Sequence, residues 1–338
     1  MDYREAGVDI STAAVAKERI KALARSTFSP AVLTEIGSFG GMFRADLSRY
    51  REPVLVASTD GVGTKIKVAI AAGVHDTVGY DLVAHCVDDI LVQGATPLFF
   101  LDYIALGKMD PVRVEQIVSG LTRACVEFGC PLLGGETAEM PGTYAEDDYD
   151  LAGFIVGVVD RARALPRRVA EGDVLLGLPS SGLHTNGYSL ARRVLFERMG
   201  LAPDTHLSEL GTTVAAALLA PHRSYLAALE PLLERDKVGA LAHITGGGFP
   251  GNVPRVLPEG LGARVRRGSW EVPAVFRLIQ RGGEVADDEM YRTFNMGIGM
   301  VVCVSPADLH EVEHSLERRG ETSFVIGSVV AGSGVSWD

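Results

Sequence analysis

The feature that most constrains the fold is the stretch at residues 53–65, PVLVASTDGVGTK, where a short apolar run leads into a polar loop with two glycines. Residues 54–57 are apolar and rich in β-branched side chains, which predicts a buried strand that ends at Ser58-Thr59. The loop then supplies a carboxylate, two glycines, a hydroxyl and an ammonium group, from Asp60, Gly61, Gly63, Thr64 and Lys65. Such a loop can hold a phosphate or a divalent cation, because glycine lets backbone N–H groups approach an anion. The same residues also fit an ordinary polar turn, so both interpretations stay open at this point.

Composition limits the class of protein. The chain has 338 residues, which suggests two domains, and 47% of them are hydrophobic, enough to form sizeable cores. Its net charge of −11 argues against a general nucleic-acid binder, although local groups can still bind an anionic ligand. There is no apolar run of membrane-spanning length, and the N-terminal residues MDYREAGVDI do not resemble a signal peptide. The four cysteines form no C-x-x-C pair, so we expect buried thiols in a cytosolic protein.

Strands and helices are expected to alternate along the whole chain, which indicates an α/β or α+β class. In the first half we expect strands at 53–57, 97–106, 131–133 and 151–159, and helices at 10–25, 67–72, 81–93 and 111–128. In the second half we expect strands at 174–178, 262–267, 296–304 and 324–330, and helices at 188–199, 206–235 (two, broken at Pro221), 252–257, 273–281 and 306–319. The basic segment 161–172 reads as a junction between an N-terminal domain, 1–165, and a C-terminal domain, 166–338.

Acidic residues mark a candidate metal site in the first half. Asp60 follows a strand, Glu136 follows the brief strand at 131–133 in the sequence GGET, and Asp89 lies beside Asp88 inside a mostly apolar helix. That acidic pair either faces solvent or turns one carboxylate toward a cation, because an unpaired buried carboxylate is costly. Mg²⁺ prefers oxygen ligands, so with Lys65 and the glycine-rich loops the residues favour a Mg-nucleotide enzyme. The P-loop and dinucleotide-binding patterns are both absent, which argues against a P-loop kinase and a dehydrogenase.

Two further glycine-rich loops lie in the second half. PSSGLHTNG at 179–187 precedes a helix, an arrangement that can bind an anion, and HITGGG follows at 243–248. His184 in the first of these loops is either a structural hydrogen-bonding residue or a donor that faces a ligand.

A resemblance to a known family rests on several stretches. Residues 89–97, DILVQGATP, resemble the D-x-x-x-x-G-A-x-P signature of an ATP-using superfamily. The superfamily includes aminoimidazole ribonucleotide synthetase, formylglycinamide ribonucleotide amidotransferase, selenophosphate synthetase, thiamine-monophosphate kinase and a hydrogenase-maturation protein. Within it the chain is similar to the aminoimidazole ribonucleotide synthetase family, the phosphoribosylformylglycinamidine cyclo-ligases. The matching stretches are DYREAGVDI at 2–10, STDGVGTK at 58–65, FFLDYIALGK at 99–108, GGETAEMPGTY at 134–144, DYDLAGFIVGVV at 148–159, LPSSGLHTNGYSL at 178–190, HITGGG at 243–248 and RTFNMGIGM at 292–300.

The resemblance implies a PurM-like fold and a reaction. The N-terminal sheet would form a barrel across a homodimer interface, and the C-terminal α/β domain would cover the nucleotide cleft. A dimer also agrees with the residues, because the first half has many apolar strands and few helices to cover them. The implied activity is that of a ligase of purine biosynthesis: formylglycinamidine ribonucleotide and ATP give aminoimidazole ribonucleotide, ADP and phosphate.

The resemblance also implies roles for individual residues. Asp60, Asp89 and Glu136 resemble the Mg²⁺ carboxylates of the superfamily, and Lys65 would contact the ATP phosphates and assist catalysis. His184 and Asn186 would bind substrate or handle a proton. The implied ATP-binding positions are Thr59, Asp60, Gly61, Gly63, Thr64, Lys65, Asp89, Gly94, Gly135 and Glu136. Thiamine-monophosphate kinases carry a further acid in an early glycine-rich loop that here reads GSFGGMF, so the number of metal ions stays open.

Related activities are the main alternatives. A selenophosphate synthetase would need a reactive cysteine near the start, whereas the first cysteine here is Cys86 in an apolar helix. The hydrogenase-maturation protein would carry a C-terminal cysteine tail where this sequence reads GSGVSWD, and the amidotransferase is longer or needs partner subunits. A nucleotide-sensing module without catalysis is the non-enzymatic alternative, and the presence of every candidate acid and of Lys65 argues against it.

Overall fold

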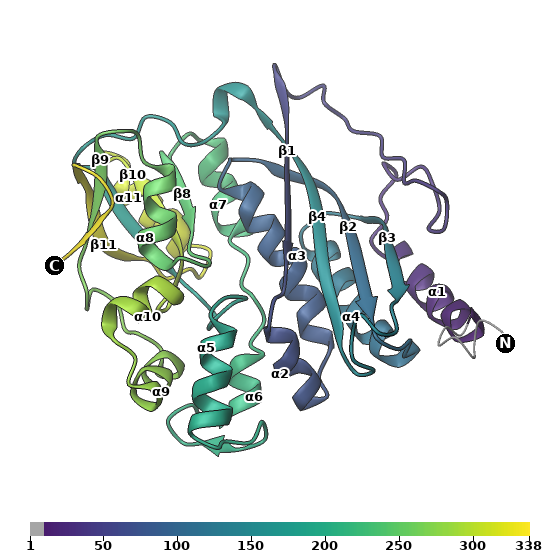
Figure 1. The fold of residues 1–338 in the computed structure, drawn as a ribbon. Helices are drawn as coiled ribbons and strands as arrows, with labels where there is room; N and C mark the ends of the chain where they lie inside the picture. Colours follow the sequence, from purple (N-terminus) through teal and green to yellow (C-terminus); the bar gives the residue numbers. More distant parts are fainter. Residues whose placement is uncertain (1–9) are drawn as a thin grey trace. The chain divides into compact units, whose positions relative to one another are not determined.

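The computed structural model describes residues 10–338 and separates them into two units. The N-terminal unit comprises the described part of Met1–Ile90 together with Pro97–Val158, and the C-terminal unit comprises Leu91–Thr96 and Val159–Asp338 (Figure 1). The domain bounds expected at 165 and 166 stay a prediction. Residues 2–9 of the stretch DYREAGVDI lie outside the described residues.

The N-terminal unit is built on a four-stranded sheet in the order β1-β4-β2-β3. These strands are β1 (Pro53–Gly61), β4 (Tyr149–Asp160), β2 (Thr96–Leu106) and β3 (Leu132–Glu139). Strands β2 and β3 are parallel, and their register places Asp102 opposite Gly135 and Tyr103 opposite Glu136. The helices of the unit are α1 (Ile10–Arg25), α2 (Lys65–Ala72), α3 (Asp76–Leu91) and α4 (Pro111–Glu127).

Two glycines bring the backbones of α3 and α4 into direct contact. A Cβ atom on Gly79 of α3 would lie 2.1 Å from the carbonyl oxygen of Ile117, and one on Gly120 of α4 would lie 2.3 Å from that of Asp76. The helix pair packs on the sheet through apolar side chains: Cβ on Gly153 of β4 would lie 2.4 Å from a ring carbon of Phe100 and 3.0 Å from Leu82 of α3. The sequence therefore fixes α3 closely, both against α4 and against the sheet.

The opposite face of this sheet is apolar and exposed. Along β4, Leu151 and Ile155 are buried in the core, whereas Phe154, which points to the other face, is 40% exposed. Leu55 of β1 is 62% exposed, and Tyr103 of β2 is 37% exposed. Among the described residues, this open face is a region of large apolar side chains without a covering layer.

The C-terminal unit is built on a six-stranded sheet in the order β12-β9-β11-β5-β10-β8. Neighbouring strands are antiparallel except β12 and β9, which are parallel. The strands are β12 (Val335–Trp337), β9 (Leu261–Val265), β11 (Phe324–Ala331), β5 (Val174–Pro179), β10 (Ile298–Val304) and β8 (Ala240–His243). Every residue of β10 is buried, so this strand lies in the centre of the core.

Helices and short elements surround this second sheet. They are α5 (Tyr188–Arg192), continued by a π-helical turn at Arg193–Arg198, α6 (Val214–Leu218), α7 (Leu226–Glu234), α8 (Gly248–Asn252), α9 (Ala274–Gly283), α10 (Asp287–Thr293) and α11 (Leu309–Glu317). Short 3₁₀ turns lie at Arg161–Arg163 and Val253–Val256, and β6 (His206–Leu207) pairs with β7 (Thr212–Thr213). None of the helices in the described part of the chain is long and apolar enough to cross a bilayer.

The mixed α/β class predicted from the sequence is confirmed, and the helix at 10–25 is found at α1 (Ile10–Arg25). Two strand ends were placed wrongly. Strand β1 continues to Gly61, because Thr59 Oγ1 donates to the carbonyl oxygen of Gly153 at 2.8 Å and holds the end of β1 against β4. Strand β3 continues to Glu139, because β2 provides a parallel partner along its whole length, so Glu136 lies in a strand. Helix α10 and strands β6, β7 and β12 were not predicted, and the β6–β7 pair lies at 206–213, where the first of two helices was expected. Helix α3 begins five residues earlier than expected, at Asp76.

Candidate functional site

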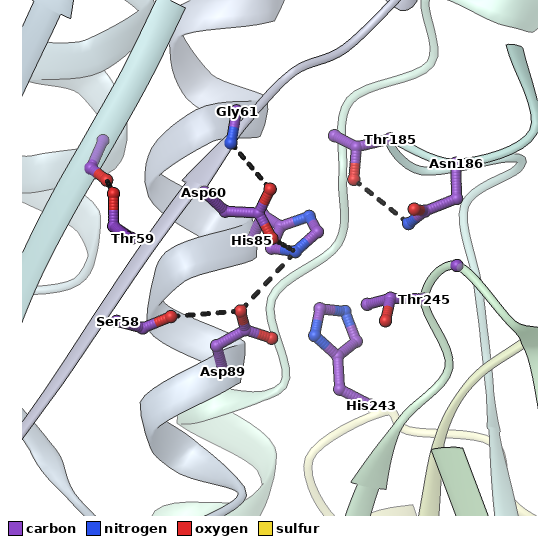
Figure 2. Close-up of polar contacts among 12 residues, drawn as sticks. Ser58, Thr59, Asp60, Gly61, His85, Asp89, Thr185, Asn186, His243 and Thr245 are labelled. Carbon is purple, nitrogen blue, oxygen red and sulfur yellow. Dashed lines mark hydrogen bonds and ion pairs between the residues drawn. The ribbon is translucent and has the colours of Figure 1, made fainter. Parts of the chain in front are cut away.

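Two of the predicted metal-binding carboxylates meet at one imidazole in the N-terminal unit. His85 Nε2 lies 2.8 Å from Asp60 Oδ2 and 3.6 Å from Asp89 Oδ2 (Figure 2). Asp60 also accepts a hydrogen bond from the backbone N–H of Gly61 at 2.6 Å, and Ser58 Oγ donates to Asp89 at 3.3 Å. The side chains of Asp60 and Asp89 remain 43% and 25% exposed, so their remaining oxygen lone pairs are accessible to a ligand.

The charges of this group are strongly coupled. Burial favours a raised pKa for Asp60, but the hydrogen bond and positive charge of His85 and the N–H of Gly61 lower it overall. Burial favours a lowered pKa for His85, but its hydrogen bond to Asp60 and the charges of Asp89 and Asp60 raise it overall. The raised pKa of His85 and the lowered pKa of Asp60 thus both favour an ion pair between the His85 imidazolium and the Asp60 carboxylate.

The group forms part of a polar stripe along α3. Asp81, His85 and Asp89 recur at intervals of four residues, which places all three on one face of the helix. At the first of these positions, Asp81 Oδ2 lies 2.7 Å from Lys65 Nζ, and both side chains are completely buried. The stripe therefore contacts the end of β1 through His85 and the start of α2 through Asp81.

The position of Lys65 bears on its predicted contact with ATP. Its ammonium group is in the interior of the N-terminal unit, at 0% exposure, and burial lowers its pKa although Asp81 opposes that shift. This ion pair gives Lys65 a defined role in joining α2 to α3. The phosphate contact stays a prediction.

Glu136 lies away from the other two carboxylates. It is on β3, whereas Asp60 is on β1, and these strands form the two edges of the sheet. Three strand spacings of about 4.8 Å place the two edges about 14 Å apart. This strand order, which the sequence alone did not reveal, favours separate positions for Glu136 and Asp60, and the role of Glu136 as a metal ligand stays a prediction.

Asp102 is a titratable group near Glu136 that sequence reasoning did not include in the site. Burial, together with the negative charge of Glu136, raises the pKa of Asp102 to about 7. A Cβ atom on Gly135 would lie only 2.1 Å from Asp102 Oδ1, so any larger residue at position 135 of the GGET sequence would collide with this carboxylate.

The other predicted ATP-binding positions have identifiable local roles. Gly63 has φ of +62°, which suits glycine in the turn that leads to α2, and Thr64 is the N-cap residue of α2. Thr59 bonds to β4, and a Cβ atom on Gly61 would lie 3.1 Å from the carbonyl oxygen of Leu151. Gly94 also has a positive φ, +78°, in the turn after α3. Contact of these residues with ATP stays a prediction.

In the C-terminal unit, the loop at 180–187 is organised by Asn295, a buried residue that sequence reasoning missed. The Asn295 amide donates to the carbonyl oxygen of Gly182 at 2.8 Å, and its oxygen accepts from Ser180 Oγ and the N–H of Gly297, each at 2.9 Å. Its presence in the stretch RTFNMGIGM was the available signal, but only the fold brings that stretch to the loop.

The two predicted residues of this loop differ in exposure. His184 is only 1% exposed, has φ of +60°, and accepts a hydrogen bond at Nε2 from the N–H of Ser181 at 3.2 Å. Asn186 is partly exposed, and a Cβ atom on Gly246 would lie 3.2 Å from its side-chain oxygen. The loop at 180–187 and the turn at 245–248 are thus neighbours within this unit, and Asn252 fixes the turn by donating to the carbonyl oxygens of Thr245, Gly246 and Gly248.

His85 and Asp81 were also missed by sequence reasoning. The available signal was the spacing of four between Asp81, His85 and Asp89 in an otherwise apolar helix. The group that includes Asp60 and Asp89 fits Mg²⁺ in its chemistry, because it offers two partly exposed carboxylates, and a nearby imidazole fixes their orientation.

Comparisons with known proteins define the class of the chain. Residues 46–159 match the family described as AIR synthase related protein, N-terminal domain, and residues 170–338 match AIR synthase related protein, C-terminal domain. The chain therefore belongs to the AIR synthase related family.

Two curated relatives are similar to this chain over nearly its full length. A protein of Sorangium cellulosum named phosphoribosylformylglycinamidine cyclo-ligase is 54% identical over 332 residues, covering 97% of this chain and 95% of the relative. A protein of Brevibacillus brevis with the same name is 50% identical over 342 residues, covering 99% of each chain.

Solved structures show that the fold is shared more widely. Thiamine-monophosphate kinase from Stenotrophomonas maltophilia matches with a TM-score of 0.69 at 20% identity, covering 96% of each chain. The hydrogenase maturation protein HypE of E. coli matches with a TM-score of 0.64 at 18% identity, covering 94% of this chain and 92% of that one.

The buried Lys65–Asp81 pair gives a stability prediction. Lys65→Met should destabilise the protein by about 3–5 kcal/mol, because Asp81 loses the ammonium group that compensates its buried charge. The double variant Lys65→Met/Asp81→Leu should recover most of that loss, since two apolar side chains can replace a buried ion pair at little cost. The measurement is the free energy of unfolding in urea.

Lys67 provides the matched control. Its Nζ lies 2.5 Å from Asp148 Oδ2, but these side chains are 44% and 28% exposed, so Lys67→Met should cost no more than about 1 kcal/mol. Equal losses for Lys65→Met and Lys67→Met would show that the buried pair does not stabilise the fold.

Proposed function

We propose that the chain catalyses the ATP-dependent cyclisation of formylglycinamidine ribonucleotide to 5-aminoimidazole ribonucleotide, with release of ADP and phosphate, in de novo purine biosynthesis. The observation that carries this proposal is 50–54% identity, over nearly the full length of both chains, to relatives named phosphoribosylformylglycinamidine cyclo-ligase. The paired carboxylates of Asp60 and Asp89 support it, because a reaction that consumes ATP requires a site for a nucleotide-bound cation.

The proposed chemistry activates an amide oxygen. The formyl oxygen of the substrate attacks the γ-phosphorus, the bond from that phosphorus to the bridging oxygen breaks, and ADP leaves. The amidine nitrogen then attacks the formyl carbon and loses a proton, the carbon–oxygen bond breaks, and phosphate leaves with that oxygen. Phosphorylation is needed because an amide oxygen is otherwise a poor leaving group, and positioning with charge neutralisation supplies most of the rate.

The N-terminal unit would hold the nucleotide. Asp60 and Asp89 would bind Mg²⁺, which neutralises phosphate charge when bound, while His85 keeps both carboxylates oriented. Glu136, on the other edge of the sheet, would serve a second position. Lys65 reaches an ATP phosphate in this proposal only if its ion pair with Asp81 opens.

The C-terminal unit would hold the ribonucleotide. Its loop at 180–187 and turn at 245–248 offer backbone N–H groups, and Asn186 offers a side-chain amide beside that turn. His184 is the other candidate for substrate binding or proton handling, although its burial favours an indirect role. The cytosolic location predicted from the sequence belongs to the same proposal, and four buried free cysteines support it.

We also propose a homodimer formed through the N-terminal unit. The open sheet face carries Leu55, Tyr103 and Phe154, which expose large apolar surfaces that a second copy would cover. Strands β1 and β3 are the two edge strands of this sheet, and among the described strands of the unit each has a neighbour on one side only. Closing a barrel with a second copy would give both edges a partner.

Light scattering tests this dimer. The wild-type protein should have twice the chain mass of 36.0 kDa at micromolar concentration, and Phe154→Lys should reduce it to one chain mass, because a charge on the open face opposes its burial. Val112→Lys is the matched control, since Val112 is 56% exposed on α4, away from that face. A wild-type monomer, or a Phe154→Lys dimer as stable as the wild type, would contradict the proposal.

Manganese binding in the presence of ATP, followed by electron paramagnetic resonance, tests the metal site without requiring turnover. Asp60→Asn and Asp89→Asn should each weaken binding at least tenfold, and the double variant should be little worse than the more damaging single one, because both lose the same ion. Glu136→Gln should act independently, and Asp147→Asn, at 81% exposure, should have no effect. Wild-type affinity in Asp89→Asn would remove that residue from the site.

Isotope transfer tests the reaction itself. Substrate labelled with ¹⁸O at the formyl oxygen should give ¹⁸O-labelled phosphate, measured by mass spectrometry, in an amount equal to the aminoimidazole product. Asp60→Asn should lower both products together. Appearance of the label in water while ATP is still split would rule out the phosphorylated-amide route.

A further inference from the structure

Three buried imidazoles form a cluster in the C-terminal unit. His184 comes from the loop at 180–187, His222 from the segment between α6 and α7, and His243 from the end of β8, and they are 1%, 0% and 5% exposed. The rings of His184 and His222 stack, with centroids 4.0 Å apart and planes inclined by 27°. His222 Nε2 lies 3.3 Å from His243 Nε2, so His222 is the central member of the histidine cluster.

The geometry favours packing and hydrogen bonding over a shared metal ion. Nitrogen atoms of all three rings lie within 4.8 Å of one another, which by itself would suit a three-histidine site. However, each nitrogen lone pair lies in the plane of its ring, and the planes of His184 and His222 run side by side. Their lone pairs therefore do not converge on one point, as tetrahedral coordination requires.

Hydrogen bonds fix the proton positions in the cluster. Because His184 Nε2 accepts from the N–H of Ser181, that nitrogen carries no proton, and the ring is the neutral form with its proton on Nδ1. Between His222 and His243, one Nε2 donates and the other accepts. His184 is thereby unsuited to act as a general base through Nε2.

His184 is also enclosed by its neighbours. A Cβ atom on Gly299 of β10 would lie 2.6 Å from His184 Cε1 and 2.1 Å from Tyr225 Oη, so only glycine allows this ring to pack there. The backbone of His184 has φ of +60°, a conformation that costs free energy in a residue with a side chain. Packing of its ring is what compensates for that conformation.

We propose that His222 is a positioning residue, which acts through its stacking contact with His184 to hold the loop at 180–187 in the conformation that presents Asn186 to the ribonucleotide. This inference rests on the proposed function, in which that loop contacts the substrate. The His222 ring packs on one face of the His184 ring, and this contact stabilises the backbone of His184 in its positive-φ conformation. The positions of the next two residues, Thr185 and Asn186, depend on that backbone conformation. His222 itself touches no reacting atom in this scheme.

Two variants of His222 separate the stacking contact from the hydrogen bond. His222→Phe keeps a flat ring against His184 but loses the bond to His243, whereas His222→Leu keeps apolar volume but loses the stacked ring. Protein labelled with ¹⁵N-histidine reports the tautomer of His184 directly by NMR, without turnover. His206→Leu is the control, since His206 is an exposed residue of β6.

The expected result is a difference between these variants. His222→Phe should retain the wild-type signal of an unprotonated Nε2 in His184 and a KM for the ribonucleotide within about twofold of wild type. His222→Leu should lose that single tautomer and raise the same KM about three- to tenfold, as expected for loss of one aromatic contact, with the KM for ATP unchanged. An unchanged tautomer and KM in His222→Leu, or equal losses in both variants, would overturn the proposal. Absence of cyclisation in the wild type would instead refute the proposed function, and the NMR comparison would still decide the role of His222.

Discussion

The buried contact between Lys65 and Asp81 constrains the whole N-terminal unit. Neither charge is tolerated alone in an interior, so the chain must bring the start of α2 to α3 wherever the fold forms. Once that contact is made, the loop that leads from β1 to α2 has little freedom, and Asp60 is placed next to the same helix. His85 and Asp89 lie one and two helical turns further along, so a single structural ion pair sets the register of the charged groups at the end of β1.

Much of the fold could be predicted from local patterns. The helix of α4 begins at Pro111 and has Val114, Ile117 and Leu121 on its inner face, and these signals need no knowledge of the rest of the chain. The ends of β1 and β3 could not be predicted in the same way. Thr59 and Glu136 look like loop residues next to glycines, and only pairing with distant strands extends the sheet through them. Propensity is overridden where a neighbouring strand supplies the hydrogen bonds.

The candidate site shows the same division between local and long-range information. Asp60 and Asp89 were predicted because acids at such places are chemically conspicuous, and the structure brings both to His85.

The burial of Lys65 was not predictable, because the type of residue is equally suited to phosphate binding and to an internal ion pair. The separation of Glu136 from Asp60 depends on strand order, which no local pattern specifies. Asn295 and His222 act on a loop more than 30 residues away in sequence. Asn295 lies in the stretch RTFNMGIGM, but nothing local in that stretch indicates its contact with the loop, and His222 belongs to no recognised motif.

The glycine contacts between α3 and α4 have a thermodynamic consequence for ligand binding. With Gly79 and Gly120 in backbone contact, α3 cannot rotate or slide without a collision between main-chain atoms. In the proposed metal site, the Asp89 carboxylate on α3 would therefore be held in place before a cation binds, because its helix has little conformational entropy left to lose. Cation binding would then lose little conformational entropy, because the helix is already ordered when the protein folds. Gly79 and Gly120 would thus lower the entropic cost of binding at a site that neither of them contacts.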